Sequence, residues 1–471
     1  MIPHRVRPAT LVPLDFDQIR IDLSVPGPFP VDVLAAASEA AASRPAPPVD
    51  ATDLELVTVD PPGALDLDQA VAIERAGAGW RVRYAIADVG AWIVPDGPVD
   101  LAALDRTQTH YAPDRRTPLH PEVLSEAAAS LLPDGPRPAV LWTIDVDADG
   151  TTAAVDVRRA LVRSRAQLTY EQVQADLDAG HPHPAVAELA HLGEALLADA
   201  RRRGAIELGL PEQVVAQAAD GTWTVTLRRD LPVERWNAQV SLLTGRAAAA
   251  LMLDGGIGLL RTLPDAPPDA IPRLRGTARH LGIDWPEGRH PGELLAGLDL
   301  SRPRHAAFAE EAAELLRGAG YRAFQGAAPD DAGHAGIGGP YAHVTAPLRR
   351  LVDRYATEIC LALAAGDPVP EWVLARLDAL PEAMRAGDGR AKAFDRAIVD
   401  ATEAFVLQHR VGDRFRATVA DAGDRYGTVV IEDPAIRARC DGPDLPVGEA
   451  VDVRCTVADV TERRVRFEAI G

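Results

Sequence analysis

The sequence predicts an α+β protein that ends in a small all-β barrel, and two observations lead to this fold class. Up to about residue 408, segments with alternating hydrophobic residues are mixed with segments that repeat at the helical period. From Val411 onwards the helical period disappears, and short alternating segments are separated by Gly, Asp and Pro. The chain has 471 residues, of which 47% are hydrophobic, so a large core and two or three domains are expected.

The elements of the main part follow in order along the chain. Residues 1–48 are rich in Pro and Ala and form a lead-in segment with one short helix expected over 31–42. An α+β domain is expected over 49–408. Alternation predicts strands at 80–87, 155–162 and 222–227, and helical spacing predicts helices at 185–203, 237–253, 349–364 and 391–407.

Residues 411–471 contain the short strands of a small barrel of the OB type. Strands are predicted at 414–420, 427–431, 450–457 and 464–469. Such barrels bind single-stranded nucleic acid mainly by aromatic stacking, and Phe415 and Tyr426 are the plausible stacking pair. Since aromatic residues are few here, the barrel either binds weakly or only braces the main domain.

Charge and cysteine content exclude several classes of protein. The net charge of −20 argues against binding of nucleic acid over the whole surface, although local arginine clusters are compatible with an enclosed channel. The three cysteines are far apart and lack ligand-like spacing, so neither a disulfide partner nor a zinc site is indicated. No apolar run approaches the roughly 18 residues of a membrane helix. These features predict a cytoplasmic protein with no membrane partner.

Three carboxylates are crowded into the run DPPGALDLDQ at 60–69. Asp66 and Asp68 are two residues apart and point to one side of an extended backbone. Asp60 can fold back over them through the Pro61-Pro62-Gly63 turn. Three hard oxygen ligands facing one point suit Mg²⁺ or Mn²⁺. The alternative is a solvated acidic loop.

The same spacing opens a series of motifs that resembles the RNB exoribonuclease family, which includes ribonuclease II and ribonuclease R. The family pattern D-x5-D-x-D-D-A corresponds to 60–70, and further blocks follow in family order: IADV at 86–89, RTQTHYAPDR at 106–115, RPAVL at 137–141, SRAQLTY at 164–170, RGAI at 203–206 and GPYAHVTAPLRRLVD at 339–353. The resemblance implies an RNB-type catalytic domain of mixed sheets and surrounding helices over 49–408, followed by an S1-like OB barrel over 411–471. Family members usually carry two cold-shock barrels at the N-terminal end, and 1–48 is too short for two, so a short form without them is expected.

The resemblance implies a 3′-to-5′ exoribonuclease that hydrolyses single-stranded RNA to nucleoside 5′-monophosphates with Mg²⁺ or Mn²⁺. Asp60, Asp66 and Asp68 correspond to metal ligands, and Asp68 is the one most closely tied to catalysis. Gln69 stands where the family has a fourth Asp, so this ligand position lacks its charge. Arg349 matches the arginine that clamps the scissile phosphate.

Aromatic residues are implied to hold the RNA, which is expected to bind to a monomer. Tyr111 and Tyr170 match the tyrosines that stack on the 3′-terminal bases, and Tyr341 is expected to line the same cavity, although each could instead be a core residue. Ser241 and Leu242 fall where the family has acids that contact a ribose. Together with the neutral fourth ligand, this departure keeps an alternative open, in which the chain is a catalytically impaired RNB protein that acts as an RNA-binding module.

Overall fold

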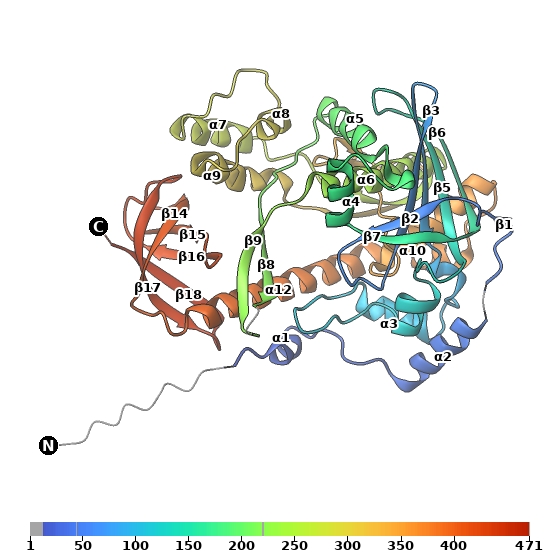
Figure 1. Cartoon of the computed structure of the whole chain (residues 1–471), viewed down its shortest axis with the longest axis horizontal. Coiled ribbons are helices and arrows are strands. Elements are labelled where there is room, and N and C mark those ends of the chain that lie inside the picture. Colours follow the sequence, from blue (N-terminus) through green and yellow to red (C-terminus); the bar gives the residue numbers. More distant parts are fainter. Residues whose placement is uncertain (1–12, 44, 219–220, 471) are drawn as a thin grey trace.

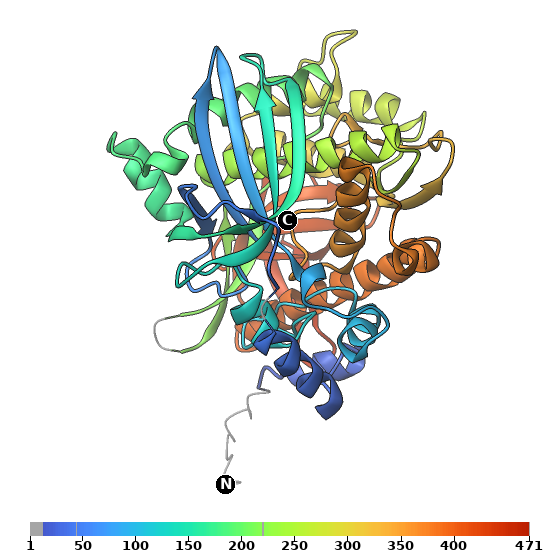
Figure 2. The ribbon, with the colours of Figure 1, turned by 90° about the vertical axis from the view of Figure 1, so that its right-hand side faces the viewer.

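A seven-stranded sheet forms the centre of the larger part of the molecule (Figures 1 and 2). The structure is a computed structural model that describes residues 13–43, 45–218 and 221–470. The strands are β1 (Val49–Asp50), β2 (Leu56–Asp60), β3 (Gln69–Ala76), β4 (Gly79–Ala87), β5 (Arg137–Val146), β6 (Thr152–Val162) and β7 (Ser164–Thr169). Their order is β1-β6-β5-β4-β3-β2-β7, in which β1 pairs with β6 and β2 with β7 in parallel. The strands predicted at 80–87 and 155–162 are confirmed.

Helices cover both faces of this sheet. One face carries α5 (Leu189–Arg202), α6 (Pro232–Asp254) and α10 (Leu351–Ala365), whose apolar residues share one core with the sheet. The other face carries α2 (Val31–Ala42) and α3 (Pro98–Arg106), which enclose a second core. Four helices predicted from spacing, at 31–42, 185–203, 237–253 and 349–364, therefore correspond to α2, α5, α6 and α10.

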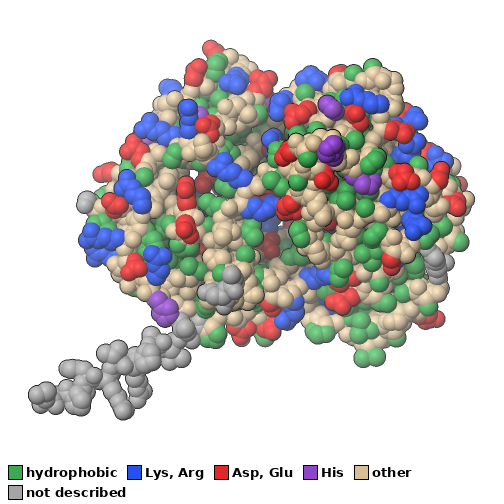
Figure 3. Space-filling model, in the orientation of Figure 1, with side chains coloured by type: hydrophobic (Ala, Val, Ile, Leu, Met, Phe, Trp, Pro, Cys, Tyr) green, Lys and Arg blue, Asp and Glu red, His purple; other side chains and the backbone are tan. Residues whose placement is uncertain are grey.

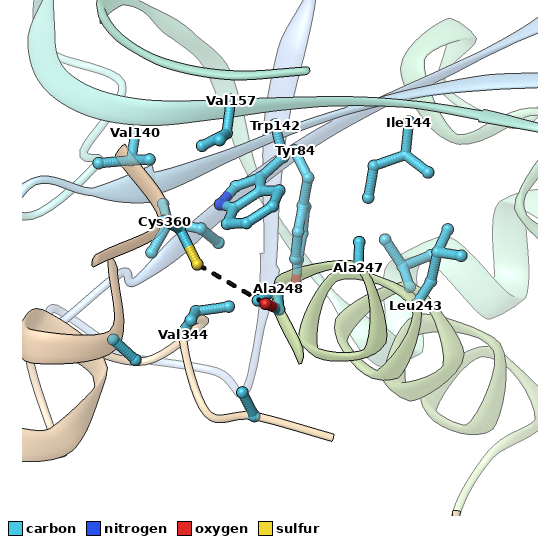
Figure 4. Close-up of a cluster of buried hydrophobic side chains, with 14 of the residues drawn as sticks. Tyr84, Val140, Trp142, Ile144, Val157, Leu243, Ala247, Ala248, Val344 and Cys360 are labelled. Carbon is cyan, nitrogen blue, oxygen red and sulfur yellow. Dashed lines mark hydrogen bonds between the residues drawn. The ribbon is translucent and has the colours of Figure 1, made fainter. Parts of the chain in front are cut away.

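Strict alternation along β3 and β4 explains the two cores. Val71, Tyr84 and Ile86 belong to the first core, whereas Ala70 and Ala85 belong to the second. Figure 4 shows the first core, where Tyr84 and Trp142 from the sheet approach α6 and the Sγ of Cys360 donates to the carbonyl of Ala248 at 3.9 Å. On β3 and β4, large side chains thus face α5, α6 and α10, and alanines face α2 and α3.

The long helix α12 (Leu380–Leu407) runs towards the barrel and begins eleven residues before the predicted start at 391 (Figure 1). Gly387 and Gly389 lower the helix propensity of its first half. Gly387 is required by packing, because a Cβ at this position would lie 1.9 Å from the Oγ1 of Thr107. The same glycine that obscures the helix in the sequence lets it approach the 107–110 segment closely.

The C-terminal residues form a closed barrel with strand order β14-β15-β16-β18-β17. Its strands are β14 (Arg414–Ala422), β15 (Tyr426–Ile431), β16 (Ile436–Asp441), β17 (Ala450–Asp459) and β18 (Arg464–Ala469). Four of them were predicted, and β16 is the fifth. The last turn of α12 closes one end, since Ala404 and Leu407 belong to the barrel core. The predicted fold class, α+β with a C-terminal all-β barrel, is confirmed.

The predicted stacking pair of the barrel is wrong for Phe415. In β14, Phe415 faces inward, is 7% exposed and packs edge-on against Phe467. Tyr426 is 47% exposed, and the guanidinium of Arg439 lies 3.8 Å from the centre of its ring. The barrel therefore presents one of the two predicted aromatic rings, and an arginine covers it.

Further helices and two-stranded pairs complete the fold. They are the helices α4 (Tyr170–Asp178), α7 (Ala270–His280), α8 (Pro291–Ala296), α9 (Pro303–Glu311) and α11 (Glu371–Leu377), and the two-stranded pairs β8 (Glu212–Gln217) with β9 (Trp223–Arg228), β10 (Ile257–Thr262) with β11 (Gly320–Gln325), and β12 (Gly333–His334) with β13 (Gly339–Pro340). The strand β9 confirms the prediction at 222–227. The space-filling view is hollowed between the barrel side and the sheet side (Figure 3).

The described residues before β1 pack partly on the long helix α12. The first helix, α1 (Phe16–Asp22), packs Phe16 and Ile19 against Phe394 and Ile398 of α12.

All three cysteines are buried and free. Within the described residues, no helix is both long and apolar enough to cross a membrane.

Candidate active site

The first carboxylate, Asp60, ends strand β2 and is largely buried. The strand stops here because Pro61 and Pro62 have no backbone N–H for pairing, and Gly63 reverses the chain with a φ of +78°. Burial raises the pKa of Asp60 to about 6. Its Oδ2 has no hydrogen-bond partner, and a buried carboxylate oxygen without a partner is costly unless a cation pairs with it.

Asp66 follows this turn, and both of its oxygens are occupied. The Nη1 of Arg116 lies 2.9 Å from Oδ1, and the hydroxyl of Tyr111 donates to Oδ2 at 3.1 Å. Arg116 also lies 2.6 Å from the Oε2 of Glu126. One guanidinium therefore neutralises part of the acidic charge of the turn.

Asp68 connects the turn to the loop that precedes α10. The backbone N–H of Ala87 donates to its carbonyl at 2.9 Å, which extends the β3–β4 ladder by one residue. The N–H of Leu348 donates to Oδ1 at 2.7 Å, and the Nε of Arg349 lies 3.7 Å from Oδ2. Burial raises the pKa of Asp68 well above its usual value, and Arg349 acts against this shift. The side chain of Arg349 is 51% exposed, so it is presented to solvent beside a buried carboxylate.

Gln69 is the first residue of β3, and hydrogen bonds to protein hold both ends of its amide. Its Nε2 donates to the carbonyl of Thr345 at 2.6 Å, and the hydroxyl of Tyr84 donates to its Oε1 at 2.6 Å. Strand alternation places Gln69 on the same face of β3 as Val71, which belongs to the first core. Both ends of the amide are thus bonded to protein.

The arginines 349 and 350 are adjacent but have different environments. The Nη2 of Arg350 lies 2.8 Å from the Oδ1 of Asp353, which is fully buried and also accepts from the N–H of Ala346 at 2.7 Å. Arg350 and Asp353 therefore fix the start of α10. Arg349 remains directed at Asp68 and solvent.

The structure brings both predicted base-stacking tyrosines to the carboxylates. Tyr111 is 46% exposed and bonds to Asp66. Tyr170 begins α4, next to Thr169, which pairs with Asp60 across β2 and β7. Burial, followed by the nearby charge of Asp60, raises the pKa of Tyr170 to about 12. Each ring therefore borders one end of the acidic turn.

Tyr341 has a different environment. It is 7% exposed, and its ring lies edge-on to His334 and His343 at centroid distances of 5.9 and 5.4 Å. A Cβ added at Gly245 would lie 2.2 Å from its Cε2, so the helix α6 also covers it. These contacts give Tyr341 a packing role, and its contact with RNA stays a prediction.

The carboxylates fit a divalent cation in part. Among the described residues, no three His, Cys, Asp or Glu side chains converge closely enough to hold a metal ion. Asp60 and Asp68 suit a cation, because both are buried with raised pKa values and the Oδ2 of Asp60 lacks a partner. Asp66 is instead paired with Arg116 at 2.9 Å.

Sequence reasoning missed three residues that shape this site. Arg116 follows the block at 106–115 and was not singled out, although it is the counter-ion of Asp66. Tyr84 and Thr345 bind the amide of Gln69. The alternation of β3 gives the face of Gln69, but its partners require the three-dimensional fold.

Comparison with known families is decisive for the classification. The RNB domain matches residues 49–364, and the RNase II-type exonuclease C-terminal S1 domain matches 413–470. The chain belongs to the RNB family. The resemblance read from the motifs is thereby confirmed, as is the S1-like identity of the barrel.

Curated relatives of this RNB protein are named ribonuclease R and exoribonuclease 2. The chain is 28% identical to ribonuclease R of Vibrio parahaemolyticus over 79% of this chain and 47% of the relative. It is 26% identical to ribonuclease R of Escherichia coli over 90% of this chain and 57% of the relative. It thus spans about half the length of these relatives.

Solved structures share the fold. The apo form of Mycoplasma genitalium RNase R matches with a TM-score of 0.87 at 18% identity, over 97% of this chain and 77% of that chain. The same enzyme has been described in complex with ribose-methylated single-stranded RNA, with a TM-score of 0.86. A yeast pseudonuclease also matches, with a TM-score of 0.71 at 16% identity, over 93% of this chain and 56% of that chain.

Proposed function

We propose that this RNB protein is a 3′-to-5′ exoribonuclease that hydrolyses single-stranded RNA to nucleoside 5′-monophosphates with Mg²⁺ or Mn²⁺. The observation that carries the proposal is that the charge of the solvent-facing Arg349 acts on both the largely buried Asp60 and the buried Asp68. Buried acids with raised pKa values beside an exposed guanidinium are typical of a site that handles a charged substrate. The names of the relatives support the same activity.

Each residue has a distinct task in this proposal. Asp60 and Asp68 hold the metal, and Asp66 joins them. The bound metal supplies an activated water and stabilises charge on the phosphoryl oxygens. Arg349 binds the scissile phosphate through its guanidinium fork. Tyr111 stacks on a terminal base, which any base can satisfy, so degradation is independent of sequence.

The second aromatic contact is Tyr170, which stacks on a terminal base at the Asp60 end of the turn.

The proposed division of the chain is a lead-in over 1–48, a catalytic domain over 49–408 and a barrel over 411–471. A monomer in a reducing, cytoplasmic compartment is part of the same proposal and rests on the three free cysteines.

A second candidate function is an RNA-binding module with impaired catalysis. It is favoured by the neutral Gln69 and by the ion pair that Arg116 makes with Asp66. The shared fold of a yeast pseudonuclease means that the fold alone does not decide between the two candidates.

Digestion of a 5′-labelled oligoribonucleotide separates these candidates. With Mg²⁺ or Mn²⁺, the wild-type protein should shorten the strand from its 3′ end and release nucleoside 5′-monophosphates. Asp68→Asn should reduce the rate by about 10³-fold or more, as expected when metal catalysis is disabled, and should still retain RNA on a filter. An intact label with normal RNA binding by the wild type would favour the binding module instead, and internal cleavage would contradict both.

A further inference from the structure

We propose that Gln69 is a positioning residue that fastens the loop at 345–349 to strand β3 and that it does not ligate the metal. The inference deepens the proposed nuclease function and rests on it only for its effect on turnover. It concerns the position where the RNB pattern has a fourth Asp, so it assigns a different task to this residue in the present chain.

Two consecutive residues hold the two ends of this loop. Asp68 accepts from the N–H of Leu348 at 2.7 Å, and Gln69 donates to the carbonyl of Thr345 at 2.6 Å. Arg349 is the next residue after Leu348, and its Nε lies 3.7 Å from Asp68. The position of the phosphate-binding arginine therefore depends on both bonds.

The chemistry of the amide fixes its orientation. A backbone carbonyl can only accept a hydrogen bond, so Nε2 must face Thr345 and Oε1 must face the hydroxyl of Tyr84. An ionised carboxylate at position 69 has no hydrogen to donate, and its oxygen would face the carbonyl oxygen of Thr345. The loop contact in this chain thus requires an amide.

The second departure from the family pattern meets the same residue. The Oγ of Ser241, on α6, lies 2.8 Å from the Oγ1 of Thr345. Gln69 holds the carbonyl of Thr345 and Ser241 holds its hydroxyl. Gln69 and Ser241, the two residues at which this chain departs from the family pattern, therefore contact the same loop residue, Thr345. The loss of a single metal ligand would not explain the change at position 241.

The variant Gln69→Glu tests the assignment, because it keeps the size of the side chain and replaces the donor with a charged acceptor. Gln217→Glu is the matched control, since Gln217 makes the same type of bond, to the carbonyl of Gly221 at 2.9 Å, in an exposed hairpin. Three quantities are measured: the affinity of the metal-free protein for Mn²⁺ by calorimetry, amide hydrogen exchange of the 345–349 segment, and kcat and KM for RNA.

If Gln69 fastens the loop, Gln69→Glu should leave Mn²⁺ affinity within about twofold of the wild type. Exchange at 345–349 should accelerate by about tenfold, and kcat should fall by a similar factor with little change in KM, as expected for the loss of about one hydrogen bond. Gln217→Glu should change none of these. Mn²⁺ affinity that rises tenfold with unchanged loop exchange would show that position 69 is a metal ligand and would overturn the assignment.

Two further measurements keep the test decisive. Gln69→Met removes the donor without adding charge, so it should accelerate loop exchange in the same way, and unchanged exchange would contradict the assignment even if Gln69→Glu fails to fold. In an Arg349→Ala background, Gln69→Met should reduce kcat much less than in the wild type, because its effect passes through Arg349. If no variant and no wild-type protein degrades RNA, the proposed function fails, whereas the exchange data still decide the role of Gln69.

Discussion

Replacing Asp60 with Asn should stabilise the metal-free protein at neutral pH. The carboxylate is largely buried, its Oδ2 lacks a hydrogen-bond partner, and burial raises its pKa from 3.8 to about 6. Asn has the same size and carries no charge, so the substitution removes the cost of burying an ion. The prediction is therefore a gain in the free energy of unfolding at a residue that the proposed chemistry needs.

The size of the gain follows from the two pKa values. At 1.36 kcal/mol per pKa unit, the gap between 3.8 and about 6 corresponds to about 3 kcal/mol. The folded protein binds this proton more tightly than the unfolded chain does, so the destabilisation is absent below pH 3.8 and complete above pH 6. The gain from Asp60→Asn should thus approach about 3 kcal/mol at pH 7.5 and fall to roughly half of that at pH 5.

Urea unfolding with a chelator at pH 7.5 and pH 5 measures this effect. Asp66→Asn is the control with the opposite sign, because Asp66 is paired with Arg116 at 2.9 Å and loses that ion pair. Added Mn²⁺ should stabilise the wild type and leave Asp60→Asn unchanged. A loss of stability in Asp60→Asn with chelator present, or a gain of the same size at both pH values, would refute the buried-charge argument.

Two further predictions concern packing. Gly387→Ala should destabilise the protein by about 1–3 kcal/mol through overpacking, because its Cβ would lie 1.9 Å from the Oγ1 of Thr107. Gly389→Ala should instead stabilise α12 by up to about 1 kcal/mol, because a Cβ there would have nothing within 4 Å. Thermal unfolding of both variants checks the contrast. Phe415→Ala should cost about 3–5 kcal/mol in the barrel, and Tyr426→Ala much less because its ring is 47% exposed. Equal losses in the second pair would contradict the inward orientation of Phe415.

Periodicity revealed most elements of the fold, and its failures have physical causes. Alternation identified β4 and β6 because their faces meet different cores. The first half of α12 was missed because Gly387 reads as a helix breaker, while its actual reason is the close approach of Thr107. The barrel prediction erred at Phe415, since the presence of an aromatic residue does not reveal which way its strand faces.

The candidate site could be predicted only where one motif carries it. Asp60 and Asp68 lie in one run of sequence, but Arg349 comes from a loop about 280 residues later, so its approach to Asp68 followed from resemblance alone. Neighbouring letters in the motif do not reveal their different partners, because Asp68 and Gln69 appear as one ligand pair in the sequence. In the fold Asp68 accepts from the N–H of Leu348, whereas the amide of Gln69 bonds to the carbonyl of Thr345 and the hydroxyl of Tyr84.

These partners explain why an amide suits position 69. The Oε1 of Gln69 accepts from the hydroxyl of Tyr84, a residue of β4 that is 1% exposed, so an ionised Asp at position 69 would need a cation to offset its burial. Gln instead satisfies two buried partners with hydrogen bonds that are each worth about 1 kcal/mol. The amide at position 69 thus donates one hydrogen bond to the loop that carries Arg349 and accepts another from Tyr84, and an ionised carboxylate could not make both.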